Sequence, residues 1–144
     1  MIMRIKPGNK DNGSTLLMLK HTYLEKKTQR NLNAVLRCLA ASEVYLGERS
    51  GEGKIKTDDG RLFEPVLITD EEGKRHLPVF SNLQVLPQEF IEDGISTKIS
   101  AEICVEISKK INDLEGVVLD PFVEPVYLNF EKIDFLTHLL TSSK

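Results

Sequence analysis

The sequence predicts a single α+β domain in which helices cover a mixed β-sheet of about five strands. Segments with the apolar spacing of amphipathic helices alternate along the chain with short runs rich in β-branched and aromatic residues, and no internal repeat interrupts them. The 144 residues are 40% hydrophobic and 28% charged, which is ordinary for one folded domain. A chain of this length buries enough apolar surface to fold without disulfides or structural metal ions.

The chain begins with a predicted flexible arm, Met1 to Gly13, and residues 14–144 are expected to form the domain. The arm mixes a proline, two glycines and two asparagines with scattered basic residues, and such a composition buries little surface. A short apolar run, Ser14 to Lys20, follows the arm. Its composition is compatible with a small helix that packs back on the domain.

A longer helix is expected from Thr22 to about Ala41. Thr22 and Glu25 have the spacing of a capping box, in which a hydroxyl caps the helix and a carboxylate three residues later returns a hydrogen bond. Apolar residues recur at helical spacing along this helix and should form its inward face: Leu32, Val35, Leu36 and Leu39.

A strand is predicted at Glu43 to Leu46, followed by a glycine-rich surface loop from Gly47 to Gly60 with a possible loose hairpin at Lys54 to Thr57. The loop invites comparison with phosphate-binding loops. The comparison fails because five residues rather than four separate Gly47 from Gly53, and Ile55 stands where a hydroxyl would bind magnesium. A plain turn is therefore the favoured interpretation.

A β-hairpin is expected next, with strands at Leu62 to Thr69 and Lys74 to Phe80. Gly73 supplies the left-handed residue that short hairpin loops require. Pro65 and Pro78 have no N–H to donate to a strand ladder, so each is expected at a strand end, an edge or a bulge.

Ser81 and Asn82 offer caps for a helical segment toward Phe90, and a second helix should start near Ser100. Gly116 is placed to end that second helix as a C-cap. The expected apolar face of the second helix consists of Ile103, Ile107, Ile111 and Leu114.

Two short strands, Val117 to Leu119 and Val126 to Leu128, are predicted to follow, with a turn at Asp120 and Pro121 between them. Asn129 can cap a final helix. The residues of that helix expected to face inward are Ile133, Leu136 and Leu140.

Cys38 and Cys104 both lie in apolar helical patterns. Their positions indicate buried free thiols and a reducing, cytosolic compartment. No signal peptide is recognisable, and no stretch approaches the roughly 20 apolar residues of a membrane span. A cytoplasmic protein is therefore expected.

No catalytic residue, metal ion or cofactor is predicted. The histidines, His21, His76 and His138, are far apart in sequence and lack neighbouring cysteine pairs, so no zinc motif is present. His76 lies in a strand that should alternate faces, and a packed or surface histidine is favoured over a general base.

The charge is unevenly distributed. Residues 1–37 carry eight Lys or Arg and two acids, a net +6, so the rest of the chain carries −9. Nucleic-acid binding through Lys26, Lys27 and Arg30 is one interpretation. A solvated helix face is favoured, because no aromatic side chains are interleaved with these charges and the acidic remainder would repel phosphates.

Three segments carry motifs in a consistent order: Leu36 to Tyr45, Phe63 to Ser81 with its Leu-Pro-Val-Phe-Ser return, and Gly116 to Phe122 with its Gly-Val-Val-Leu-Asp-Pro run. Together they resemble the N-terminal domain of the SseB (enhanced serine sensitivity) family of bacterial proteins. The likeness spans about Asn31 to Leu140. It departs from the family at Asp120, where asparagine is usual, and the chain is similar to a single-domain version of the family.

The resemblance implies a module without established catalytic residues, and we expect it to bind a protein partner or a second copy of itself. The motif positions that could frame a binding site are Pro78, Phe80, Ser81, Asp120 and Pro121. A structural role is favoured for them, because turn chemistry already explains these residue types. The alternatives are a small-molecule-binding regulator or enzyme linked to amino-acid metabolism, with a cleft near Phe80 and Asp120, and nucleic-acid binding.

Overall fold

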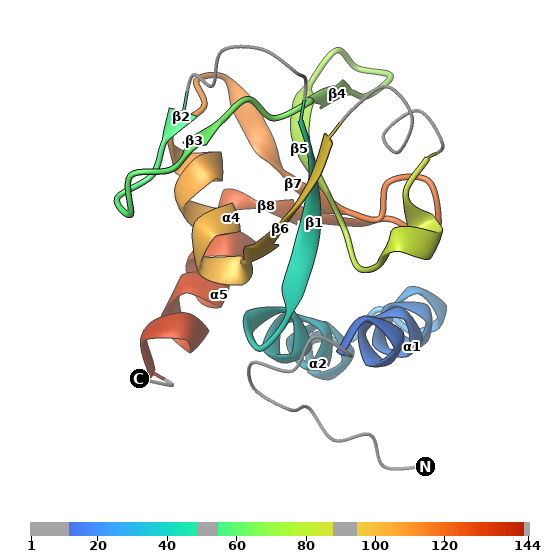
Figure 1. Cartoon of the computed structure of the whole chain (residues 1–144). Helices are drawn as coiled ribbons and strands as arrows, with labels where there is room; N and C mark the ends of the chain where they lie inside the picture. The colour runs from blue at the N-terminus through green and yellow to red at the C-terminus, as the bar shows by residue number, and fades with distance from the viewer. Residues whose placement is uncertain (1–11, 49–54, 88–94, 143–144) are drawn as a thin grey trace.

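A computed structural model describes residues 12–48, 55–87 and 95–142 (Figure 1). In these ranges a six-stranded mixed sheet has the strand order β6-β1-β5-β7-β8, and β4 also pairs with β5. The predicted α+β class is confirmed. The helices are α1 (Asn12–Glu25), α2 (Gln29–Ala40), the 3₁₀ helix η1 (Leu83–Val85), α4 (Ala101–Lys109) and α5 (Phe130–Ser142). The strands of the main sheet are β1 (Glu43–Glu48), β4 (Ile68–Thr69), β5 (Arg75–Phe80), β6 (Ile95–Ser100), β7 (Leu114–Leu119) and β8 (Val126–Asn129), and β2 (Ile55–Lys56) pairs with β3 (Leu62–Phe63) in a separate hairpin.

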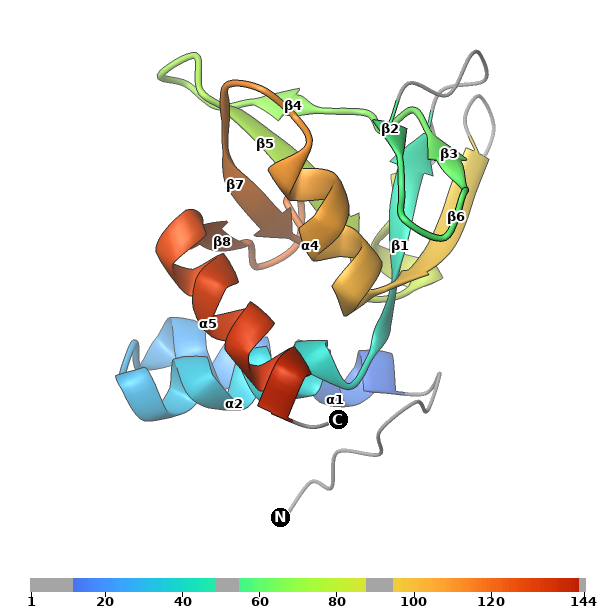
Figure 2. The same ribbon diagram turned by 90° about the vertical axis from the view of Figure 1, so that its left-hand side faces the viewer.

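The central pair of the sheet, β5 and β7, is parallel, and the other described pairs are antiparallel. A parallel pair needs a crossover connection, and here η1, β6 and α4 lie between the two strands in sequence. Because β5 and β7 run the same way, their carboxyl ends meet at the same end of the sheet. Figures 1 and 2 place α1 and α2 at one end of the sheet and α4 and α5 over one face.

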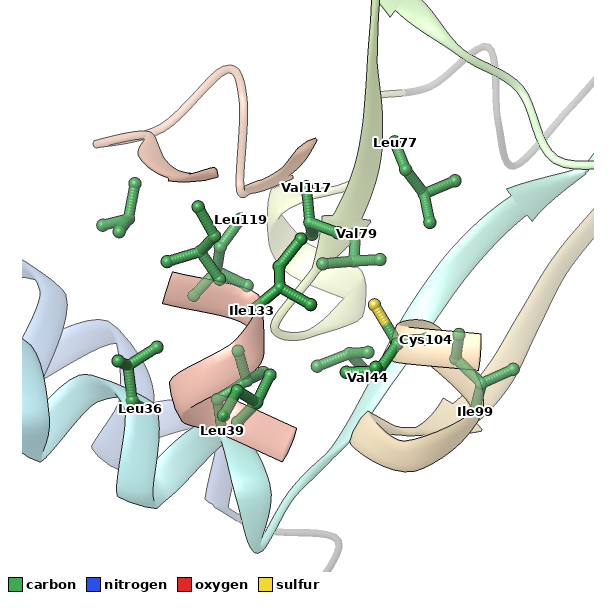
Figure 3. Close-up of a cluster of buried hydrophobic side chains, with 14 of the residues drawn as sticks. Leu36, Leu39, Val44, Leu77, Val79, Ile99, Cys104, Val117, Leu119 and Ile133 are labelled. Atoms are coloured by element: carbon green, nitrogen blue, oxygen red, sulfur yellow. The ribbon is translucent and has the colours of Figure 1, made fainter. Parts of the chain in front are cut away.

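The main core lies between the sheet and the helices α2, α4 and α5. Side chains from β5, β7 and α5 meet in it, among them Val79, Val117 and Ile133 (Figure 3). The predicted inward face of α2 is confirmed, because Leu32, Val35, Leu36 and Leu39 are all buried. Ile133 and Leu136 of α5 are buried as well.

The opposite face of the sheet is also covered near its centre. Phe80 and Val118 are fully buried but lie outside the main core, and Leu86, just after η1, is 7% exposed. β5 is therefore buried on both faces, as is usual for a strand with a parallel neighbour.

The predicted helix from Thr22 to Ala41 is wrong at its N-terminal end. Helix α1 ends at Glu25, and Thr28 caps α2 by accepting a hydrogen bond from the Asn31 N–H at 3.1 Å. The Thr22 hydroxyl instead donates to the Met18 carbonyl within α1. A break at residues 26–28 lets α1 fold back against α2, which one continuous helix would not allow. Helix α1 also contains the predicted run Ser14 to Lys20.

The hairpin prediction is right at its turn and wrong in its first strand. Gly73 has the expected positive φ of 81°, and β4 pairs with β5 across this turn. The predicted strand Leu62 to Thr69 is divided, because its first two residues form β3 and pair with β2 while its last two form β4. The predicted loose hairpin at Lys54 to Thr57 is wrong, because its described residues hold one strand, β2, which pairs with β3 further along the chain. Residues 49–54 lie outside the described residues.

The two prolines occupy different kinds of position. Pro65 forms an isolated bridge with Glu48. Pro78 lies in the interior of β5, so its expected place at a strand end, edge or bulge is wrong. It sits where one neighbour of β5 changes from β4, which pairs at His76, to β1, which pairs at Val79. Pro78 pairs with Val118 of β7, but neither β4 nor β1 opposes it on the other edge of β5, so its missing N–H costs no ladder bond on that edge.

The second predicted helix begins as expected and ends early. Ser100 caps α4 by accepting from the Ile103 N–H at 3.2 Å, but the helix ends at Lys109. Leu114 and Gly116 belong to β7 rather than to a helix end. A Cβ on Gly116 would lie 2.1 Å from the Leu128 carbonyl oxygen of β8, so the close approach of two backbones requires glycine here.

The remaining caps are as predicted where they can be described. Asn129 accepts from the Lys132 N–H at 3.0 Å at the start of α5. Asn82 accepts from the Gln84 N–H at 2.8 Å and caps η1, and residues 88–94 of the expected helical segment lie outside the described residues. β6 is a strand that the sequence patterns did not predict. In the described part of the chain, no helix has the length and apolar character needed to cross a bilayer.

Candidate functional site

A buried ion pair joins α1 to the carboxyl ends of β5 and β7. Lys20 Nζ lies 2.9 Å from Asp120 Oδ2, and both side chains are 0% exposed. Asp120 also accepts hydrogen bonds from the Ser81 N–H and the Ser81 hydroxyl, each at 2.7 Å. Lys20 completes its coordination by donating to the Val123 and Glu124 carbonyls at 2.8 and 2.9 Å. We call Lys20, Ser81 and Asp120 the buried knot.

The backbone after β7 explains why the knot can form. Asp120 has a φ of 52° and Glu124 a φ of 51°, so the chain turns sharply at both ends of the 120–124 loop. Aspartate tolerates this left-handed conformation better than most residues. The carboxylate therefore turns inward, where it meets Ser81 from the neighbouring parallel strand, and Lys20 ties the loop to α1.

The structure brings together some of the motif residues singled out from the sequence. Phe80 is fully buried, and its ring stacks on Phe122 with centroids 6.5 Å apart. Ser81 and Asp120 share hydrogen bonds, and Pro121 is half-buried beside them. Pro78 lies two residues before Phe80, in the interior of β5. Phe80, Ser81 and Asp120 thus shape the 120–124 loop from inside the protein.

Sequence reasoning missed Lys20. A lysine is ordinarily exposed, and its pairing with a residue one hundred positions later leaves no local pattern. The available signal was its spacing of four from Leu16, which is also 0% exposed and lies on the same helical face.

An exposed apolar groove lies on the outside of the knot. Leu83, Phe122 and Val123 are 50%, 60% and 43% exposed. Phe122 and Val123 line a groove of about 380 Å³ together with Val85, Leu86, Pro87 and one polar residue, Gln84; we call it the apolar groove. The knot fixes one wall, because Lys20 holds the carbonyl of Val123 itself.

A second contact ties α1 to the same loop at the surface. His21 Nδ1 lies 2.6 Å from Glu124 Oε1, and Nε2 lies 3.1 Å from Glu25 Oε1. The hydrogen bond and charge of Glu124, with a smaller contribution from Glu25, raise the pKa of His21. When the ring is protonated, both of its nitrogens donate, and it bridges the helix and the loop.

We expect this contact to make stability depend on pH. Because the folded pKa is raised, the contribution of His21 should be fully present below the unfolded value of about 6.5 and lost as pH rises through the folded pKa. Urea denaturation from about pH 5 upward measures the difference in unfolding free energy between the wild type and His21→Gln. This difference should shrink as the pH rises from about 6.5 through the folded pKa of His21. Glu124→Gln should weaken the same dependence. A pH-independent difference would contradict the bridge.

A larger cavity, about 620 Å³ in volume, opens where β4, β5, β8 and the start of α5 meet; we call it the His76 cavity. The His76 side chain is 8% exposed, and its Nε2 lies 2.9 Å from Asp70 Oδ2. Its ring contacts Tyr127 edge to face, with centroids 5.1 Å apart. The hydrogen bond from His76, with those from the backbone of Lys74 and Glu72, lowers the pKa of Asp70. His76 is thus a packed histidine, one of the two expected environments.

The other candidate groups are placed apart from these two sites. Cys38 and Cys104 are buried, and burial raises both thiol pKa values, that of Cys104 to about 12. Both thiols therefore stay protonated near neutral pH. Lys26, Lys27 and Arg30 are exposed at the turn into α2. In the described ranges no three His, Cys, Asp or Glu side chains converge as a metal site would require.

The comparison with known protein families agrees with the motif resemblance. A family model described as the SseB protein N-terminal domain matches residues 21–133. The matched region runs from the end of α1 into α5 and includes both strand ends of the buried knot. No curated protein and no solved structure matches the chain. Because the family model covers most of the sequence, the chain belongs to the family of SseB protein N-terminal domains.

Proposed function

We propose that this SseB domain is a non-enzymatic binding module that takes a short apolar segment of a partner protein into the apolar groove. The observation that carries the proposal is the exposure of Phe122 and Val123 on a loop that is fastened from within. Exposed apolar side chains are common singly, but a contiguous set beside a groove marks an interaction surface.

The size of the exposed set favours a segment over a second copy of the chain. At their exposed fractions, Leu83, Phe122 and Val123 offer on the order of 300 Å² of apolar surface. A stable protein–protein interface buries about 800 Å² on each partner. A peptide that inserts one or two apolar anchors needs far less surface, and anchors of this kind carry most of the energy of small interfaces.

The rigidity of the loop supports the same conclusion. Ion-pair and carbonyl contacts of Lys20 hold Val123, and the ring of Phe80 supports the ring of Phe122 from below. A surface that is already ordered before binding loses little conformational entropy when the partner arrives. The motif residues Phe80, Ser81, Asp120 and Pro121 would then serve binding by shaping the groove, and Pro78 by fixing β5 beneath it.

The test is selection of a displayed peptide library on the wild-type domain, followed by titration of the selected peptides. We expect enriched sequences with one or two large apolar anchors. Phe122→Ser and Val123→Ser should each weaken their binding about tenfold or more, because a buried anchor loses its wall. Leu62→Ser is the matched control, since Leu62 on β3 is equally exposed at 60% but distant in sequence from the groove.

Two results would overturn the proposal. One is a library that yields no peptide whose binding depends on Phe122 or Val123, although both serine variants unfold at the same denaturant concentration as the wild type. The other is a concentration-dependent dimer in sedimentation experiments that Phe122→Ser abolishes, since the groove would then accept a second copy. A cytoplasmic location fits this proposal and is part of it. Of the predicted arm Met1 to Gly13, Asn12 and Gly13 belong to α1, and residues 1–11 lie outside the described residues.

A further inference from the structure

We propose that the His76 cavity is a second binding site, selective for a cationic organic group, either an alkylammonium or a guanidinium. It is separate from the apolar groove and does not depend on the function proposed there. Its volume of about 620 Å³ lies within the range of small-molecule sites.

The hydrogen-bonding groups of the cavity point to a donor ligand. In the neutral ring, a proton on His76 Nε2 donates to Asp70, which leaves Nδ1 as an acceptor. The side-chain hydrogen bond of the ring among the described residues is the one from Nε2 to Asp70, so Nδ1 is available to a donor from the ligand. The carboxylates that line the cavity are acceptors as well. A ligand that hydrogen-bonds to these atoms must bring donor groups, and the charge of the cavity selects N–H donors on a cation over neutral O–H groups.

The charges of the cavity favour a cation. Four carboxylates line it, those of Asp70, Glu71, Glu72 and Glu115, against the ammonium groups of Lys74 and Lys132. Lys74 lies 3.6 Å from Glu72 and 3.7 Å from Glu115, distances too long for tight pairs, so these carboxylates keep acceptor capacity. With a neutral histidine the lining carries a net charge of −2.

Tyr127 adds an aromatic surface to these acceptors. Its side chain lines the cavity, and Tyr127 is 47% exposed, so part of the ring remains open to a ligand. The edge-to-face contact with His76 holds it in place. An organic cation over an aromatic ring is attracted by the quadrupole of the ring, and nearby carboxylates add to this attraction. An anion would be repelled by the face of the ring and by the carboxylates.

Such a group could come from a free amine or from a lysine or arginine side chain of a protein. The test titrates the domain at low ionic strength with agmatine, with a capped Gly-Arg-Gly peptide and with a capped Gly-Gln-Gly peptide, and follows the NMR signals of His76 and Tyr127. We expect saturable binding of agmatine or the arginine peptide that weakens with added salt, and none of the glutamine peptide.

Two variants and a control locate the binding. Glu115→Gln and Tyr127→Leu should each weaken it about two- to fivefold. Glu131→Gln, which removes an exposed carboxylate of α5 outside the cavity lining, should leave it unchanged. Tighter binding of agmatine would identify a free amine, and binding of the arginine peptide a protein side chain. Absence of binding by both cations, equal binding of the glutamine peptide, or binding that Glu115→Gln and Tyr127→Leu leave intact would overturn the proposal.

Discussion

Asparagine in place of Asp120 should lower the free energy of unfolding by about 3–5 kcal/mol. The variant keeps a residue that accepts the left-handed backbone at φ 52°, and its amide oxygen can still accept from the Ser81 N–H. What it removes is the negative charge 2.9 Å from Lys20 Nζ. The ammonium would then remain buried beside two carbonyls without a counter-charge, which is the costly outcome when one member of a buried pair is deleted.

Urea denaturation of a double-mutant cycle would measure this effect. Lys20→Met should also be strongly destabilising, because it leaves the Asp120 carboxylate buried with Ser81 alone. The combination of Lys20→Met with Asp120→Asn should cost clearly less than the two single losses together, since no unpaired charge remains. Additive losses below about 1 kcal/mol each would mean that the pair is not buried as described.

Alanine in place of Gly116 should destabilise the domain by about 3 kcal/mol, the upper end of the usual cost of overpacking, or prevent folding. The new Cβ would lie 2.1 Å from the Leu128 carbonyl oxygen and 3.1 Å from the Asn129 Cα. Both atoms belong to backbone in β8, which cannot rotate away as a side chain can. Relief requires β7 and β8 to separate, at the expense of their hydrogen bonds.

Gly73→Ala is the matched comparison, because the two glycines are required for different reasons. A Cβ on Gly73 meets nothing within 4 Å, but its φ of 81° disfavours any residue with a side chain. A left-handed conformation costs about 1–2 kcal/mol. Thermal and urea unfolding should therefore rank Gly116→Ala as the more damaging change. The reverse order would contradict the close approach of β7 and β8.

Local chemistry predicted the parts of the fold that depend on near neighbours. The turn at Gly73, the cap at Ser100 and the cap at Asn129 all rest on contacts within four residues, and each is where the sequence places it. The inward face of α2 follows from periodicity alone. The wrong boundaries arose where two local patterns competed, as with the caps at Thr22 and Thr28.

Tertiary packing decided the remaining cases. Leu114 and Gly116 fit the end of a helix as well as they fit a strand, and the choice depends on β8, which lies later in the chain. Among the site residues, Ser81 and Asp120 could be named from their turn chemistry. Lys20 could not, because burial of a lysine depends on one carboxylate and two carbonyls that only the folded chain brings to it. The His76 cavity was hidden for the same reason.

The buried knot also bears on how the chain reaches its native state. Lys20 bonds to carbonyls that are 103 and 104 positions further along the sequence. During synthesis α1 can therefore pack against α2 early, but Lys20 lacks its counter-charge and both carbonyl partners until the 120–124 loop is made. Contacts of such long sequence separation slow folding, because a large loop must close first. Closure of the buried knot is thus a late step of folding, and the chain is most exposed to aggregation before it.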